Sequence, residues 1–197
     1  MIPVPFRARP AALRTCHIDT PLGGVLLAAS ADGLAGLWFD GQRHHPDPTG
    51  WEPDPGHALL QEAAGQLQDY LAGRRTGFDL PLDLSRGTPF QQAVWRGLLS
   101  IPRGGTHSYG ALGLALGRPA AMRAVGAAVG RNPVSVIVPC HRVIGADGSL
   151  TGYAGGLDRK RSLLALEGVA LPPPDRGPNA RPAARAPVAR ERTREVA

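Results

Sequence analysis

The chain has 197 residues, two cysteines and a formal net charge of +6. Apolar residues make up 43% of it, as expected for a soluble globular protein of one or two small domains. Two cysteines this far apart exclude a disulfide-rich secreted scaffold and are typical of a reducing compartment. No apolar run is long enough to span a membrane, and the first twenty residues lack the apolar segment of a signal peptide. We therefore expect a soluble cytoplasmic protein without a membrane partner.

The charge changes sign along the chain. Residues 1–85 carry six Arg against ten acidic residues, whereas residues 86–171 carry ten basic residues against three acidic ones. The last 26 residues add six Arg and three acidic residues. Codon bias explains why arginine outnumbers lysine, but it does not explain the scarcity of acidic residues in the middle segment. That segment is predicted to face a polyanion, most simply nucleic acid.

The N-terminal half reads as a small sheet with one helix. Residues 1–12 are rich in proline and are expected to form a flexible leader, so the first domain is placed at 13–85. Asp32-Gly33 is typical of a hairpin turn, and apolar residues recur at helical spacing in the segment that ends at Gly73. The elements expected here are strands at 22–30 and 34–39, a polar loop at 40–57, a helix at 59–71 and an edge strand at 78–84.

The C-terminal half, residues 86–169, reads as a mainly helical domain. Thr88 before Pro89 is a typical helix start, and Ser108 is a typical N-cap of the next helix. Two short helices are expected at 109–116 and 120–130. They are joined by a tight turn and so have the form of a helix-turn-helix. The other elements expected are a buried strand at 134–138, a glycine-rich loop at 152–156 and a helix at 157–167. A disordered tail rich in Pro, Ala and Arg is expected at 170–197, with or without a part in DNA binding.

Seven of the eleven residues in the helix predicted at 120–130 are Ala or Gly, and Arg123 is its only long polar side chain mid-helix. Small residues such as Ala121 and Ala124 let a helix approach another surface closely, whether that surface is a DNA groove or the rest of the domain. An unpaired arginine is costly to bury. Arg123 is therefore predicted to project into DNA.

Cys140-His141-Arg142 follows the strand predicted at 134–138. Neighbouring cations lower the pKa of a thiol, and the thiolate is the nucleophilic form, so Cys140 is a candidate nucleophile. Adjacent side chains usually point apart, which makes a bridging water the expected route between Cys140 and His141. The alternative is that Cys140 is only a small residue of the core.

Glu167 lies in the last turn of the helix predicted at 157–167, where the helix dipole disfavours a negative charge. A residue that breaks a local rule often marks a functional site. Glu167 is a candidate to orient His141 in a Cys–His–Glu relay, and a solvated surface carboxylate is the alternative.

No metal site is expected. Cys16-His17 and Cys140-His141 form a two-Cys, two-His set, but zinc ligands within one half of a site are spaced by two to four residues. Cys16 is therefore interpreted as structural, and His44-His45 as part of a solvated loop.

The segment Ile137-Val-Pro-Cys-His-Arg-Val-Ile144 resembles the signature of the O6-alkylguanine-DNA alkyltransferases, also called methylated-DNA–protein-cysteine methyltransferases. Arg123-Ala-Val-Gly126, Asn132-Pro133, Gly152-Tyr-Ala-Gly-Gly156 and Leu163-Leu-Ala-Leu-Glu167 extend the resemblance over 88–168. The hairpin that begins at Thr20-Pro-Leu-Gly resembles the family's N-terminal domain. The resemblance implies a ribonuclease-H-like domain followed by a winged-helix-like DNA-binding domain that carries the reactive cysteine.

The resemblance also implies roles for single residues. Cys140 would accept the alkyl group, His141 would be its water-mediated base, and Glu167 would lie behind His141. Asn132 would fasten the turn before the active-site loop. Tyr109 would help to swing out the damaged nucleotide and stabilise the leaving guanine. The remaining assignments are DNA contacts by Arg123, Tyr109, Ala121, Ala124 and Arg142, and a substrate pocket of Tyr153, Ala154, Val143 and Lys160.

The implied partner is double-stranded DNA that contains O6-alkylguanine, approached from the minor groove by a monomer. The alkyl group would stay on Cys140 as a thioether, so each molecule would act once and need no cofactor. Ala154 stands where some members have Ser, and the metal ligands of mammalian-type members have no match here. Three alternatives are a damage binder without alkyl transfer, a Cys–His–Glu hydrolase and a winged-helix transcription factor.

Overall fold

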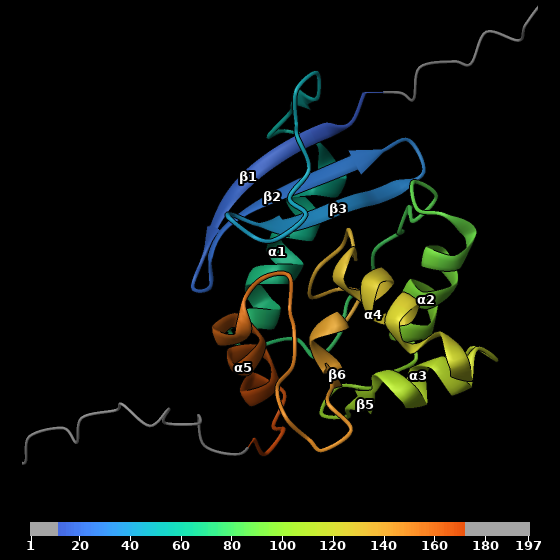
Figure 1. Ribbon diagram of the computed structural model, residues 1–197. Helices are drawn as coiled ribbons and strands as arrows, with labels where there is room; N and C mark the ends of the chain where they lie inside the picture. The colour runs from blue at the N-terminus through green and yellow to red at the C-terminus, as the bar shows by residue number, and fades with distance from the viewer. Residues whose placement is uncertain (1–11, 172–197) are drawn as a thin grey trace, which may run out of the picture.

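The computed structural model describes residues 12–171 (Figure 1). The leader predicted at 1–12 and the tail predicted at 170–197 lie almost wholly outside this range. Within it, no helix combines the length and the hydropathy needed to cross a membrane.

The N-terminal half forms a four-stranded sheet in the order β3-β2-β1-β4. The first three strands are antiparallel, and the short fourth strand runs parallel to the first. The sequence pattern missed the first strand because polar residues alternate along it and only one of its side chains is fully buried. The strands are β1 (Arg14–Thr20), β2 (Gly23–Ser30), β3 (Gly33–Phe39) and β4 (Glu52–Pro53).

Helix α1 (Ala58–Leu71) covers one face of this sheet (Figure 1). Its apolar residues recur at helical spacing, so they form one buried stripe: Leu60, Ala63, Leu67 and Tyr70. Gly73 ends the helix as predicted, with a positive φ of 72° that favours glycine. Tyr70 is the last residue of this stripe. It lies at the C-terminal end of the helix, next to the C-terminal half of the molecule.

The C-terminal half contains four α-helices, three of which pack on one another, and two very short strands. The capping predictions are confirmed: Thr88 and Gln91 form a capping box at the first helix, and the Ser108 hydroxyl accepts a hydrogen bond from the backbone N–H of Ala111. The Trp95 indole N–H donates to the Ala128 carbonyl and joins two of the helices. The elements are α2 (Pro89–Leu99), β5 (His107–Ser108), α3 (Tyr109–Ala115), α4 (Met122–Gly130), β6 (Val143–Ile144) and α5 (Leu157–Leu166).

The helix-turn-helix is present, with one correction to its second helix. A 3₁₀ turn, Pro119–Ala121, comes first, and α4 begins only at Met122. Pro119 lacks a backbone N–H and suits the first position of such a turn.

Two predicted strands are absent from the described part of the chain. The segment 78–84 makes only a single bridge, between Leu82 and Leu34. The segment 134–138 makes one bridge to Leu37 and then turns, with Val136 at a φ of 71°. Its valines are buried as predicted, but the Asn132 side chain bonds to both ends of the segment and replaces the strand ladder with a turn.

This turn connects the two halves of the molecule. Leu37 in β3 donates its backbone N–H to the Pro133 carbonyl, and the Leu37 carbonyl accepts from the N–H of Ser135. Arg159 in α5 lies over the Phe39 ring and donates to the Leu22 carbonyl. The turn at 132–138 is therefore held by contacts with the sheet as well as with the helical half.

Candidate active site

Cys140 lies in a short 3₁₀ turn, Cys140–Arg142, between the buried turn and β6. It is 4% exposed. The Asn132 side chain donates from Nδ2 to Cys140 Sγ over 2.9 Å and to the Val138 carbonyl over 2.7 Å, while its Oδ1 accepts from the N–H of Val134. Asn132 thus fastens the turn and contacts the Cys140 sulfur with one side chain.

Burial raises the pKa of the Cys140 thiol to about 11. The hydrogen bond from Asn132 and the charge of Lys160 act in the opposite direction, but they do not outweigh the loss of water. A nearby cation thus lowers the pKa of this thiol as expected, but burial outweighs it in the resting protein. Attack by Cys140 requires a base to remove its proton.

His141 is the residue suited to that task. It is fully buried, and its Nε2 lies 2.5 Å from Oε1 of Glu167. Burial lowers the pKa of His141 although Glu167 acts to raise it, so the imidazole is neutral at neutral pH. Its other nitrogen, Nδ1, is buried without a hydrogen-bond partner among residues 12–171. A neutral imidazole that donates from Nε2 leaves Nδ1 able to accept a proton.

Glu167 caps the C-terminus of α5, and its side chain is fully buried. Burial by itself raises the pKa of a carboxyl group, but hydrogen bonds from His141 and Arg142, the charge of His141 and a hydrogen bond from Tyr70 lower the pKa of Glu167 to about 2. The sequence placed this carboxylate at a position that the helix dipole disfavours. The structure supplies the donors that offset this cost.

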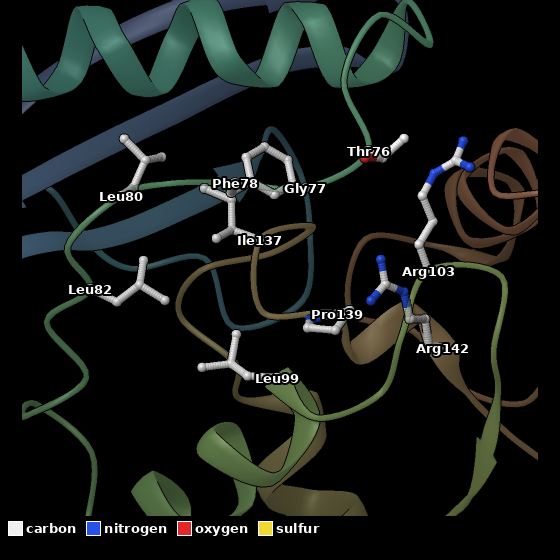
Figure 2. Close-up of a pocket in the computed structure, with 10 residues that line it drawn as sticks. All are labelled: Thr76, Gly77, Phe78, Leu80, Leu82, Leu99, Arg103, Ile137, Pro139 and Arg142. Atoms are coloured by element: carbon white, nitrogen blue, oxygen red, sulfur yellow. The ribbon is translucent and has the colours of Figure 1, made fainter.

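Arg142 requires a correction. Its side chain is 10% exposed and donates from Nε to Glu167 Oε2 over 2.8 Å and from Nη1 to the Ile101 carbonyl over 2.6 Å. A guanidinium held in this way is not available to DNA phosphates, so the predicted DNA contact by Arg142 does not hold. Figure 2 shows Arg142 with Arg103 at one end of a cavity of about 210 Å³ and Leu80 and Leu82 at its other end.

A second cavity, of about 250 Å³, lies against the helix-turn-helix. It contains three of the predicted site residues, Tyr109, Tyr153 and Ala154. Burial raises the pKa of both tyrosines, and the charge of a Cys140 thiolate acts in the same direction. The other residues that line this cavity are Arg43, His44, Gly126, Ala127, Gly130, Arg131 and Gly152.

Lys160 and Val143, also predicted in the substrate pocket, are not among the residues that line this cavity. Both are fully buried. The Lys160 ammonium donates to the carbonyls of Val143 and Thr151 over 2.6 Å each and so ties β6 to the glycine-rich loop. Burial lowers the pKa of Lys160 to about 8. Lys160 therefore shapes the loop and places a cation near Cys140.

The predicted DNA-facing residues lie at the N-terminal end of α4. Arg123 and Ala124 are exposed, and Ala121 is half-buried in the preceding turn. Met122, between Ala121 and Arg123, is 55% exposed, and sequence reasoning did not single it out because it breaks the small-residue pattern. Within residues 12–171, no three His, Cys, Asp or Glu side chains lie close enough together to hold a metal ion.

Sequence reasoning also missed residues that come from the N-terminal half. Tyr70 contacts the Glu167 carboxylate, but on α1 it has the spacing of an ordinary core residue. Arg43 and His44 line the second cavity, and the N–H of Arg43 donates to the Ala154 carbonyl over 2.9 Å. Long-range folding brings these residues to the site, and no local motif marks them.

Two family models match the chain. The model of the ribonuclease-like domain of 6-O-methylguanine DNA methyltransferase matches residues 13–84, and the model of its DNA-binding domain matches residues 89–169.

Relatives and solved structures agree with this match. The methylated-DNA–protein-cysteine methyltransferase of Mycobacterium tuberculosis H37Rv is 53% identical over 150 residues, which are 76% of this chain and 89% of that protein. The one from Methanosarcina barkeri is 46% identical over 151 residues, 76% of this chain and 94% of that protein. The crystal structure of M. tuberculosis OGT in complex with DNA is 52% identical, with a TM-score of 0.74, and the match covers 79% of this chain and 93% of that one.

A small sheet followed by a helical DNA-binding domain that buries Cys140 defines a DNA-binding protein of two domains. The chain belongs to the 6-O-methylguanine DNA methyltransferase family, and its activity is that of a DNA-repair methyltransferase. The predicted family and fold class are thereby confirmed.

Proposed function

We propose that this protein repairs O6-alkylguanine in double-stranded DNA by moving the alkyl group irreversibly to Cys140. The observation that carries the proposal is the buried relay in which Asn132 donates to the Cys140 sulfur and His141 lies against Glu167. The relay supplies an otherwise unreactive thiol with a base, and the base with a fixed anion behind it.

In the proposed transfer, each proton and each bond is accounted for as follows. A water that hydrogen-bonds to His141 Nδ1 carries the thiol proton from Cys140 to the imidazole, while Glu167 stabilises the imidazolium. The sulfur attacks the alkyl carbon in line, so an S–C bond forms and the O6–C bond breaks. Guanine leaves with the electron pair and takes up a proton, and His141 returns to its neutral form.

The second cavity is the proposed site of the extruded base. The O6 substituent of guanine lies inside the base stack, so the nucleotide must leave the duplex to reach a buried sulfur. Arg123, exposed at the start of α4, is suited to fill the space that the base leaves, by entering from the minor groove. The Tyr109 hydroxyl, which donates to the Gly152 carbonyl over 3.3 Å here, would turn to the leaving guanine.

The product is a thioether on Cys140, which water does not cleave, so each molecule acts once. The proton, the base and the acceptor all come from the chain and the water described above, and the reaction therefore requires no cofactor. We further propose that the protein acts as a monomer in the cytoplasm.

Intact mass tests the proposal. The protein is incubated with duplex DNA that contains one O6-methylguanine, and its mass is then measured. We expect a gain of one methyl group, located on Cys140 by peptide mapping and absent from Cys140→Ala. A folded wild-type protein whose mass does not change, or a methyl group on another residue, would refute the proposal.

A further inference from the structure

A tyrosine of the ribonuclease-like domain contacts the carboxylate of the relay. Tyr70, in the last turn of α1, donates its hydroxyl to Oε1 of Glu167, although the two residues are 97 positions apart. Tyr70 is 1% exposed, and its ring packs on Phe78 with the ring centroids 4.7 Å apart. The contact is therefore shielded from water, and packing on Phe78 fixes the Tyr70 ring.

The Tyr70 hydroxyl shares its acceptor with the catalytic histidine. Oε1 of Glu167 faces Tyr70, His141 Nε2 at 2.5 Å and Arg142 Nη2 at 3.2 Å. Oε2 faces Arg142 Nε at 2.8 Å and the N–H of Gly104 at 3.4 Å. Arg142 Nη2 also lies 3.4 Å from the Tyr70 hydroxyl oxygen, so this oxygen both accepts and donates. The carboxylate thus has donors on both oxygens and little freedom to rotate.

We propose that Tyr70 is a positioning residue for the alkyl transfer proposed above: its hydroxyl holds Glu167 Oε1 against His141 and disperses the negative charge of that oxygen. The ribonuclease-like domain then contributes a hydroxyl group to the relay as well as packing. This inference rests on the proposed function, because it assigns to Tyr70 a part in the same proton transfer.

The physical reason is the balance of basicity between Glu167 and His141. A carboxylate oxygen with fewer donors binds an imidazolium more strongly and raises the pKa of the histidine. A histidine that is already protonated cannot accept the Cys140 proton. By donating to Oε1, Tyr70 lowers the basicity of the carboxylate. Glu167 can then still orient His141, but it does not raise the pKa of the imidazole so far that His141 is protonated before the reaction.

Other charged and titratable groups face this pair and set the same balance. They are Arg142 from the 3₁₀ turn, Lys160 from α5, and Arg103, which donates to the Leu166 carbonyl next to Glu167. All of them remain in a variant that lacks only the Tyr70 hydroxyl. Tyr70→Phe therefore removes only the hydroxyl group, with the hydrogen bond that it donates to Glu167 and the one that it accepts from Arg142.

The test is the pH dependence of the single-turnover rate, with saturating duplex DNA that contains O6-methylguanine and quenched intact-mass detection. For Tyr70→Phe we expect transfer near neutral pH to slow by roughly three- to tenfold, the effect of losing one donor to the Glu167 carboxylate. The acid limb of the profile should move to higher pH by about half a unit to one unit, since His141 must be neutral to act. Affinity for duplex DNA should not change, because Tyr70 is buried.

The matched control is Phe78→Leu, which loosens the same packing contact and leaves the hydroxyl in place. We expect this variant to be less stable but to keep the wild-type pH profile. An unchanged rate in Tyr70→Phe, or a slower rate with an unshifted profile as in the control, would overturn the inference. A wild-type protein that gains no methyl group would instead refute the proposed function itself.

Discussion

Asn132 Nδ2 lies 2.9 Å from Cys140 Sγ, because the seven residues between them fold into a buried turn instead of a strand. The amide is the donor, so it favours the negative charge that develops on the sulfur as the proton leaves. The same side chain holds the N–H of Val134 and the carbonyl of Val138. The shape of the turn and the reactivity of the thiol therefore depend on one residue.

Asn132→Ala should lower the reactivity of Cys140. The pKa of the thiol, already raised to about 11 by burial, loses a favourable donor and should rise further. We expect alkylation by iodoacetamide and transfer from O6-methylguanine each to slow about tenfold or more. The measurement is the rate of modification of each cysteine by peptide mass spectrometry.

Cys16 is the internal control in that experiment. It is half-buried on β1, away from the turn, and should react equally in both proteins. If the ratio of the Cys140 rate to the Cys16 rate is the same in Asn132→Ala and in the wild-type protein, the proposed effect of Asn132 is contradicted.

Arg142→Lys should weaken the fold and the reaction but not the electrostatic attraction to DNA. A lysine cannot contact Glu167 and the Ile101 carbonyl at once in the way a guanidinium does. We expect the free energy of unfolding to fall by about 2–4 kcal/mol, measured by urea denaturation. The dependence of DNA affinity on salt should keep its wild-type slope.

Arg123→Ala is the matched comparison for Arg142→Lys. Arg123 is exposed, so its loss should change the free energy of unfolding by less than about 0.5 kcal/mol. It should slow repair of duplex DNA more than reaction with the free alkylated base. A reversed pattern, with the salt dependence reduced only in Arg142→Lys, would restore Arg142 as a DNA contact.

Acid should destabilise the protein partly through Glu167. Its pKa is about 2 in the folded state and about 4.5 when unfolded, so the unfolded chain binds the proton more readily. The stabilisation is therefore complete above pH 4.5 and is lost as the pH falls through 2, with a magnitude of up to about 3 kcal/mol. His141, whose pKa is lowered by burial, adds a loss that begins at higher pH, near 6.5.

Glu167→Gln should remove the Glu167 part of this dependence. The variant should be less stable at neutral pH, and its difference from wild type should narrow between about pH 5 and pH 2. Urea midpoints measured across this range check the prediction. A constant difference would show that Glu167 does not titrate as described.

Arg43 and Arg131 line the cavity proposed for the extruded nucleotide. Replacing either with Ala should weaken binding to alkylated duplex DNA and reduce the slope of affinity against salt by about one unit if that residue contacts a phosphate. Arg74→Ala, in an exposed pair with Asp69 outside the cavity, is the control and should leave the slope unchanged. Equal slopes in all three variants would exclude Arg43 and Arg131 as phosphate contacts.

Local features of the sequence were sufficient for much of this protein. Thr88 and Ser108 have the side chains that cap helices, the apolar spacing of α1 defines its buried face, and the motif around Cys140 and His141 marks the family. These signals involve residues within a few positions of one another, so they can be recognised without knowledge of the fold.

The tertiary structure decided which groups meet across the chain. Arg142 has the sequence setting of a DNA contact, yet it is buried against Glu167 because that carboxylate needs a cation once it has lost water. Tyr70 looks like any core residue until α1 brings it to the same oxygen as His141. The excess of basic residues in 86–171 predicted a nucleic-acid partner for the helical half. The raised pKa of the Cys140 thiol, in contrast, comes from burial, and burial is a property of the folded chain alone.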